Sequence, residues 1–494
     1  MARKPRVRRR QPVANSTTPA PRGGGFRPLS DEQLHEIVAA AVAILERTGL
    51  ADCPADIAEQ ACSRGAQMRA GRLHFPVSMV EDAIERAPRS VQLPGYLEQF
   101  DLRVGEGHVH IGTGGAAVEV LQPDGQTFSE ASLSDLYRLM TLVGRTDAIS
   151  YGLRPVVARD MPDDRSLDIN TAFAALSACP KPIGVSFCQA DHVGDVVSLF
   201  DVSRPRGGAF EDCPFAFAVI VHAVSPLRYA SEGVEIMRAA MAAGMPLQIC
   251  TAAQAGATSP VTLAGALALG LAETLAGLMI VDCLKPQHPT VFAFMPFVSD
   301  LRTGAMSGGG GESAVANAAA AQLLLHLGLP STVAAGMTDA KTQDVQAGYE
   351  KGYSVALAAQ AGADMINLSV GMLGSIMAAS PEALVIDAEM CAAILRSVRG
   401  VETGPGLIDL DVIHSVATGP GHFLGEAQTL ARMKSDYVYP DLANRQSIAD
   451  WQSAGRPMVW EAACDRVADL TREPPAHLPP ACEARIRAHF DIKL

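Results

Sequence analysis

The stretch that decides the fold is residues 331–352, STVAAGMTDAKTQDVQAGYEKG. It opens with small and β-branched residues, which predict a short buried strand. A glycine breaks that run, and Asp344 then stands where the N-cap of a helix is expected. Thr338, Asp339 and Lys341 therefore lie at a strand-to-helix junction, which is the ligand-binding edge of parallel α/β proteins. An ordinary helix cap on a surface loop is the alternative that the spacing leaves open.

The same alternation of strand and helix extends outward from this stretch. Strands are expected at residues 108–112, 148–153, 182–187, 215–222, 247–251, 290–294, 332–335 and 365–369. Helices are expected at residues 132–145, 167–178, 191–202, 229–243, 261–284, 312–328, 344–361 and 382–398. Eight strand–helix units over about 290 residues predict an α/β protein with a (β/α)₈ TIM barrel. A doubly wound open sheet fits the alternation too, although no GxGxxG motif follows a strand.

Four parts of the chain are expected from these patterns. Residues 1–26 are basic and then rich in Pro, Ser and Thr, which predicts a disordered tail. Residues 27–107 predict an N-terminal helical cap, whose first helix begins at a capping box formed by Ser30 and Gln33. The barrel itself is expected over residues 108–400. Residues 401–494 predict a C-terminal helical extension packed on the barrel.

Composition excludes several classes of protein. The net charge is −13 over 494 residues, and subtracting the six basic residues of the first ten leaves −19 for the rest. An acidic body argues against nucleic acid as a partner. No apolar run reaches the roughly 18 residues of a membrane span. The ten cysteines include no CxxC pair, which is typical of a reducing compartment such as the cytoplasm and predicts no zinc site.

Candidate substrate-binding residues lie near the ends of the expected strands and in the helix after residue 344. Aromatic faces and carboxylates suit a cationic ligand. The candidates are Tyr151, Phe187, His222, Phe294, Phe297 and Tyr349. His222 is the one for which a hydrogen-bonded core position is the favoured alternative.

Four consecutive glycines, at positions 308–311, precede Glu312 in the sixth expected loop. Glycines allow the backbone to approach a large ligand closely, or allow a loop to move. A floppy surface loop is the alternative.

Five segments carry a resemblance to a known family. They are LSDEQLHEIVAAAVAILERTGL (29–50), GATSPVTLAGALALGLAETLAG (256–277), SDLRTGAMSGGGGES (299–313), TDAKTQDVQAGYEKG (338–352) and GPGHFLGEAQTLARMKSDYVYPDL (419–442). The chain resembles the trimethylamine methyltransferase superfamily, the corrinoid-dependent methyltransferases of the MttB type. The resemblance implies a (β/α)₈ barrel that moves a methyl group from an amine to the Co(I) of a corrinoid. That cobalamin group is implied to arrive on a separate partner protein, because no DxHxxG cobalamin motif is present in this chain.

The family motifs imply as site residues Asp339, Lys341, Asp344, Gln346, Tyr349, Glu350, Glu312 and His422, and the ends of the expected strands and the glycine run add Thr113, Gly309, Gly310, Thr338 and Gly371. Asp339, Lys341 and Glu312 are expected to be catalytic. The residues expected to face the corrinoid are Thr113, Gly309, Gly310, Thr338, Asp344, Gln346, Glu350, Gly371 and His422.

The methyl donor is expected to be a quaternary amine of the betaine kind. Members that act on trimethylamine contain pyrrolysine, whereas this chain has only the twenty standard residues. A quaternary ammonium leaves as a neutral amine, so the protein has only to desolvate and align the two reactants. The segment MINLSVGML (365–373) contains no His, which members associated with glycine betaine carry there. Choline, carnitine, proline betaine and sulfonium compounds all remain possible donors.

Two other functions are compatible with the sequence. One is a Schiff-base barrel lyase that uses Lys341 as its nucleophile. The other is a non-catalytic barrel that binds betaines or a corrinoid protein. A homo-oligomer is possible in each case.

Overall fold

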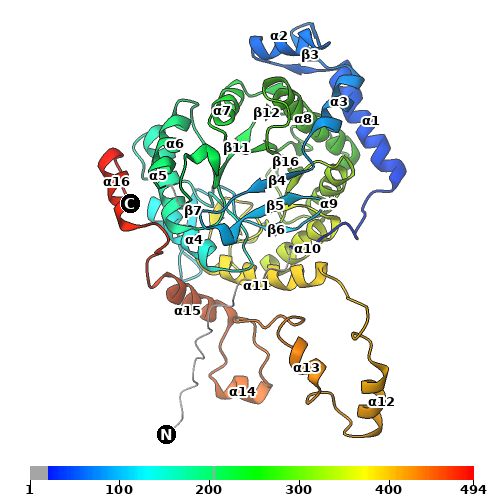
Figure 1. Cartoon of the computed structure of the whole chain (residues 1–494), viewed down its shortest axis with the longest axis vertical. Coiled ribbons are helices and arrows are strands. Elements are labelled where there is room, and N and C mark those ends of the chain that lie inside the picture. The colour runs from blue at the N-terminus through cyan, green and yellow to red at the C-terminus, as the bar shows by residue number, and fades with distance from the viewer. Residues whose placement is uncertain (1–19, 204–205) are drawn as a thin grey trace.

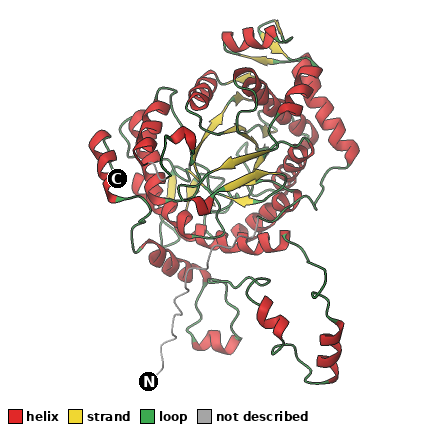
Figure 2. Cartoon of the chain, viewed as in Figure 1, coloured by secondary structure: helices red, strands yellow, loops and turns green. Residues whose placement is uncertain are grey.

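The computed structural model describes residues 20–203 and 206–494. Its centre is a curled sheet of eight parallel strands, which we call the barrel sheet (Figures 1 and 2). Its strands are β6 (His110–Ile111), β9 (Gly152–Leu153), β10 (Ile183–Val185), β11 (Ala216–Val221), β14 (Leu247–Thr251), β16 (Thr290–Phe294), β18 (Ser331–Ala334) and β19 (Met365–Asn367). The order is β6-β19-β18-β16-β14-β11-β10-β9, and a parallel bridge between Gly112 and Tyr151 joins the two edge strands. This is the topology expected of a barrel, and it excludes the doubly wound order.

Eight helices surround the barrel sheet in the described part of the chain (Figure 2). They are α4 (Leu133–Arg145), α5 (Asp164–Ala178), α6 (His192–Ser203), α7 (Ser231–Ala242), α8 (Leu263–Leu284), α9 (Gly311–His326), α10 (Val345–Ala361) and α11 (Pro381–Val398). Each lies within three residues of its expected bounds. By length and composition α8 is apolar enough to cross a membrane, but 83% of its most apolar window is buried inside the structure. It is a core helix of the barrel.

The N-terminal segment is mixed, so the expectation of a purely helical cap was wrong. Beside α1 (Asp31–Arg47), α2 (Ala55–Ser63) and α3 (Val77–Arg86) it forms β1 (Leu50–Ala51), β2 (Gln67–Arg69), β3 (Arg72–His74), β4 (Ser90–Leu93) and β5 (Leu102–Gly105). The buried residues of β4, Val91 and Leu93, alternate with polar ones over only four positions, which is too short a pattern to stand out.

The β4–β5 hairpin covers one end of the barrel sheet (Figure 1). Val91, Leu93 and Val104 share a buried cluster with Tyr151, Phe217, Val291 and Met365, which lie at or next to the first residues of their strands. The amino-terminal end of the barrel is therefore filled by apolar side chains.

Residues 20–26 lie against the barrel, so the disordered tail expected over residues 1–26 does not extend to residue 26. Val109 donates a backbone hydrogen bond to Pro21 O at 2.9 Å, and Gly23 donates one to Gly107 O at 2.9 Å. A Cβ on Gly23 would come within 2.1 Å of the carbonyl oxygen of Ala359, so only glycine fits there. The remainder of the expected tail, residues 1–19, lies outside the described residues.

The C-terminal extension has two parts. The helices α12 (Leu410–Thr418), α13 (Ala427–Arg432) and α14 (Ile448–Ser453) project away from the barrel in an arm of largely exposed residues, 401–458 (Figure 1). The helix α15 (Val459–Thr471) packs against α11 and α4, and α16 (Pro480–His489) packs against α6. Contact with the barrel is thus made mainly by the last two helices.

Candidate functional site

A cavity of about 230 Å³ opens at the carboxyl end of the barrel sheet, opposite the β4–β5 hairpin. Most of its walls are apolar, and Leu153, Val221, Met295, Phe297 and Leu368 supply them. In parallel barrels this end of the sheet carries the ligand site. The cavity is therefore the candidate substrate site, and we call it the mouth cavity.

A chain of buried polar side chains lies across the barrel beneath the mouth cavity. The Tyr151 hydroxyl donates to Asn367 Oδ1 at 2.7 Å, and Asn367 Nδ2 donates to Gln248 Oε1 at 3.2 Å. Gln248 Nε2 then donates to Thr332 Oγ1 at 2.8 Å. These bonds satisfy the buried groups and hold Asn367, which lines the cavity, in one orientation.

Among the expected substrate-binding residues, Phe297 lines the mouth cavity. Tyr151 lies inside the barrel below it, where it takes part in the polar chain. Phe187 is buried in the main core beyond the end of β10. Tyr349 lies on α10 with 57% of its surface exposed.

His222 and Phe294 face away from the mouth cavity. Successive side chains of a strand point to opposite faces, and Val221 lines the cavity, so its neighbour His222 lies on the helix-facing side. There His222 Nε2 bonds the carbonyl oxygen of Glu273 in α8 at 2.9 Å, and burial lowers the pKa of His222 to about 4. Phe294 is likewise pressed against Gly270 of α8.

Asp339 joins two loops at the carboxyl end of the barrel. Its Oδ2 accepts a hydrogen bond from the Ser307 hydroxyl at 2.9 Å, and its Oδ1 accepts from the backbone N–H of Gly308 at 2.8 Å. Oδ1 also accepts from the Ser375 hydroxyl. Ile376, the next residue, lines the mouth cavity, so Asp339 holds part of the cavity wall in place.

Glu350 fixes the same region from below. Its carboxylate, 6% exposed, accepts hydrogen bonds from the hydroxyl of Thr338 and from the backbone N–H of Asp339, the latter at 2.9 Å. Gln346 Nε2 donates to its second oxygen at 2.9 Å. A Cβ built on Gly309 would come within 2.2 Å of this carboxylate. The structure thus brings the glycine run and the 338–352 motif together.

The other residues near this junction are more exposed. Lys341 is exposed, and its Nζ donates to the Asp339 carbonyl oxygen at 2.6 Å. Asp344 caps α10 by accepting from the backbone N–H of Ala347 at 3.1 Å. Gly310 is the N-cap of α9. Glu312, in the first turn of α9, lines a second cavity of about 400 Å³.

Three of the residues expected to face the corrinoid have other positions. Two of them form hydrogen bonds that hold the backbone, and the third is exposed on the arm. The hydroxyl of Thr113 donates to the Leu153 carbonyl oxygen at 2.6 Å and so helps to close the barrel sheet. Gly371 donates its backbone N–H to Asp387 Oδ2 at 2.8 Å. His422 is exposed on the arm.

Sequence reasoning missed Arg154, which lines the mouth cavity. Arg154 is the first residue after β9 and the first charged residue after the expected strand 148–153. Its position directly after an expected strand is the sequence feature that could have indicated a site residue.

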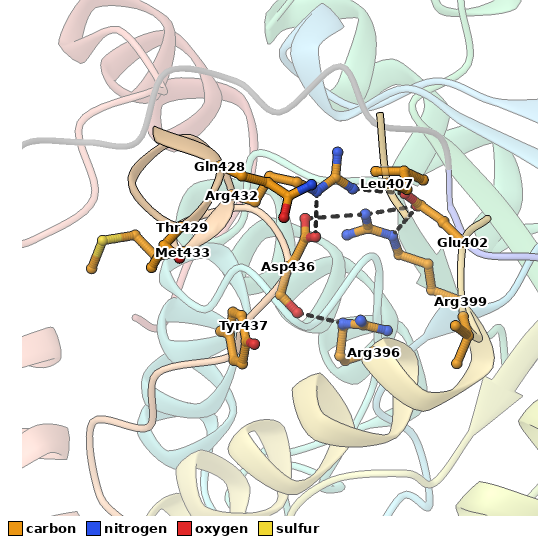
Figure 3. Close-up of a pocket in the computed structure, with 11 residues that line it drawn as sticks. Arg396, Arg399, Glu402, Leu407, Gln428, Thr429, Arg432, Met433, Asp436 and Tyr437 are labelled. Atoms are coloured by element: carbon orange, nitrogen blue, oxygen red, sulfur yellow. Dashed lines mark hydrogen bonds and ion pairs between the residues drawn. The ribbon is translucent and has the colours of Figure 1, made fainter. Parts of the chain in front are cut away.

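A further cavity, of about 290 Å³, lies where the arm leaves α11 (Figure 3). Arg399 Nε donates to Glu402 Oε1 at 2.7 Å, and Arg432 Nε donates to Asp436 Oδ2 at 2.6 Å. Arg396 donates to the Asp436 carbonyl oxygen at 2.6 Å. Its two carboxylates pair with Arg399 and Arg432, and Arg396 bonds backbone carbonyl oxygens, so these contacts hold the arm to α11.

Within the described residues, no group of three or more His, Cys, Asp or Glu side chains could hold a metal ion. All ten cysteines are free thiols.

The parallel barrel sheet and its cavity at the carboxyl end define the class as a barrel-type α/β protein. The profile of the trimethylamine methyltransferase (MTTB) family matches residues 2–493, so the chain belongs to this family and is a methyltransferase.

Two relatives and one solved structure illustrate the similarity. A glycine betaine methyltransferase of Desulfitobacterium hafniense (strain Y51) is 26% identical over 462 residues, which cover 93% of this chain and 95% of the relative. The trimethylamine methyltransferase MttB of Methanosarcina barkeri is 30% identical over 407 residues, which cover 81% of this chain and 80% of the relative. The crystal structure of the M. barkeri monomethylamine methyltransferase MtmB has a TM-score of 0.51 at 11% identity, covering 91% of this chain and 89% of that one, and shows the shared fold.

Proposed function

We propose that this methyltransferase moves a methyl group from a quaternary amine to the Co(I) of a corrinoid carried by a partner protein. The observation that carries the proposal is the mouth cavity, which is small, largely apolar and open at the ligand end of a barrel of this family. In this reaction the reduced cobalt would supply the nucleophile, the bond from nitrogen to the transferred methyl group would break, and the demethylated donor would leave as a neutral amine. The chain itself has to bind, orient and dehydrate the donor.

The residues of the mouth cavity suit that task. Met295, Phe297 and Leu368 offer apolar and aromatic surface to the methyl groups of an ammonium ion. Asn367, held by the polar chain beneath it, presents a fixed dipole from the floor. Asp339 accepts a hydrogen bond from the Ser375 hydroxyl and so helps to fix the position of Ile376 in the cavity wall. Together these groups hold the donor in one place and exclude water.

The position of Lys341 does not favour the lyase alternative. A Schiff-base lysine is activated by desolvation in a pocket or by a neighbouring cation. Lys341 is exposed and donates to a backbone carbonyl oxygen. The scattered free cysteines fit a cytoplasmic location, which forms part of the proposal.

The test mixes the purified full chain with Co(I) cobalamin and a panel of methylated amines, and follows the absorbance of methyl-Co(III). Methylation of the cobalt is expected from at least one quaternary amine and essentially none from trimethylamine. Comparable transfer from trimethylamine overturns the choice of donor. A reduced imine trapped by borohydride with a carbonyl substrate overturns the reaction itself.

A further inference from the structure

Arg154 brings a fixed positive charge to the wall of an otherwise largely apolar mouth cavity. Its Nε is buried and has no hydrogen-bond partner, and its guanidinium forms no ion pair with any residue of the described ranges 20–203 and 206–494. An Nε–H that is buried without an acceptor is costly, whereas the terminal nitrogens of this half-buried side chain are not among the buried unsatisfied atoms. An anionic group of a ligand in the mouth cavity would supply such an acceptor.

The backbone around Arg154 is rigid. Ala116 donates to the Arg154 carbonyl oxygen at 3.2 Å, and Ala117 donates to the Pro155 carbonyl oxygen at 2.9 Å. A parallel bridge joins Ala117 to Val156. Proline at position 155 restricts the conformation of the residue before it. The guanidinium thus extends from a fixed point at the end of β9.

Asp168 is the competing partner within the chain. Burial lowers the pKa of Arg154, and the nearby Asp168 carboxylate offsets part of that lowering. No ion pair joins the two side chains. Asp168 Oδ2 is already bonded to His192 Nδ1 at 2.7 Å and accepts from the Cys188 N–H at 2.8 Å, while its Oδ1 has no partner. Asp168 therefore interacts electrostatically with Arg154 but accepts no hydrogen bond from its guanidinium.

We propose that Arg154 binds a carboxylate of the methyl donor and so selects quaternary amines that carry one. The planar guanidinium matches a carboxylate in a two-pronged geometry, while the apolar wall at Met295 and Phe297 takes the methylated end. A donor with no anionic group brings a second positive charge to this wall and is disfavoured. This inference rests on the proposed function for the reaction and adds the residue that sets its specificity.

The test measures ligand binding by calorimetry, without any corrinoid. The ligands are glycine betaine, carnitine, proline betaine, choline and 3,3-dimethylbutanoate, a carboxylate with carbon in place of the ammonium nitrogen. The full chain is compared with Arg154→Gln, with Arg154→Lys, which keeps the charge, and with Arg238→Gln. Arg238 pairs with Asp56 and Glu235 on the outer surface and is the matched control.

At least one carboxylated ligand is expected to bind, and Arg154→Gln is expected to weaken it roughly tenfold to a hundredfold, since a charge-assisted contact is lost. Choline binding is expected to stay the same or improve, Arg154→Lys to retain part of the affinity, and Arg238→Gln all of it. In turnover, the KM for the carboxylated donor is expected to rise more than kcat falls.

Unchanged carboxylate affinity in Arg154→Gln overturns the inference, as does a wild-type chain that prefers choline. If Arg154→Gln lowers the melting temperature but leaves ligand binding unchanged, the inference is also overturned. Arg154 then has a structural role beside Asp168. These outcomes are independent of cobalt methylation, so failure of the transfer reaction refutes the proposed function separately.

Discussion

Gly309 lies directly over Glu350, so close that a side chain on the glycine would occupy the position of the carboxylate. The same carboxylate holds Thr338 and the backbone of Asp339. The contact therefore links the glycine run before α9 to the loop after β18. Glycine is needed at position 309 because the Glu350 carboxylate, 41 residues further along the chain, leaves no room for a side chain there.

Gly309→Ala is expected to displace Glu350 and loosen the wall of the mouth cavity. Forcing an extra methyl group into a packed site costs about 1–3 kcal/mol. Both kcat/KM for methyl transfer and the free energy of unfolding in urea are expected to fall. Gly311→Ala is the control, because a Cβ there has no neighbour within 4 Å. Equal effects of the two substitutions would contradict the steric argument.

Asp339→Asn is expected to lower kcat/KM roughly tenfold, because the charge-assisted bonds that tie the two loops are weakened. Lys341→Ala is expected to stay within about twofold of wild type, since Lys341 is exposed and bonds only a backbone oxygen among the described residues. Steady-state kinetics with the preferred donor measures both. Loss of all activity in Lys341→Ala would restore the Schiff-base alternative.

Lys351 and Asp387 form a buried ion pair with a nitrogen–oxygen distance of 2.7 Å and side-chain exposures of 0% and 1%. Lys351→Met leaves Asp387 unpaired and is expected to cost about 3–5 kcal/mol in urea unfolding. The double variant Lys351→Met/Asp387→Asn is expected to be more stable than that single variant, because no unpaired charge remains while Gly371 keeps an acceptor. A double variant no more stable than the single one would argue against charge burial as the cause.

Burial lowers the pKa of His222 to about 4, so the folded state binds fewer protons than the unfolded state between about pH 4 and pH 6.5. The free energy of unfolding is therefore expected to fall as the pH drops through this window, by roughly 3 kcal/mol for this group. His222→Gln keeps a donor for Glu273 O without the titration, and its urea midpoint is expected to change less between pH 7 and pH 4. The exposed His414→Gln is expected to behave as wild type. An unchanged pH slope in His222→Gln would rule this account out.

The helices of the barrel could be predicted because they are long segments of 12 to 22 residues that alternate with short apolar strands. The strands β14 and β16 have the expected bounds, and Asp344 caps α10 as its position suggested. The N-terminal strands could not be predicted, since β1 and β4 have two and four residues. Their stability comes from pairing and from contacts with the barrel, which a local pattern does not record.

Several expected site residues lie near the carboxyl end of the barrel sheet, whereas His222 takes the hydrogen-bonded core position that was its favoured alternative. His222 follows Val221, and a shift of one position moves a side chain to the other face of the strand. Arg154 was not predicted, because a charged residue after a strand does not by itself show that its side chain lines a cavity. The motif at 338–352 was located correctly, yet the bonds of Asp339 to Ser307 and Ser375 join distant loops and needed the fold to be seen.

The β4–β5 hairpin has a consequence for the order of events in the proposed reaction. Because Val91, Leu93 and Val104 fill the amino-terminal end of the barrel, we expect the donor, the demethylated amine and the corrinoid partner of the proposed reaction to use the carboxyl-terminal end. A partner docked over that opening traps whatever the cavity holds. Kinetics should therefore be compulsory-ordered, with the donor bound before the corrinoid protein arrives and the demethylated amine released after it departs. Excess corrinoid protein should then inhibit turnover by occupying the entrance of an empty enzyme.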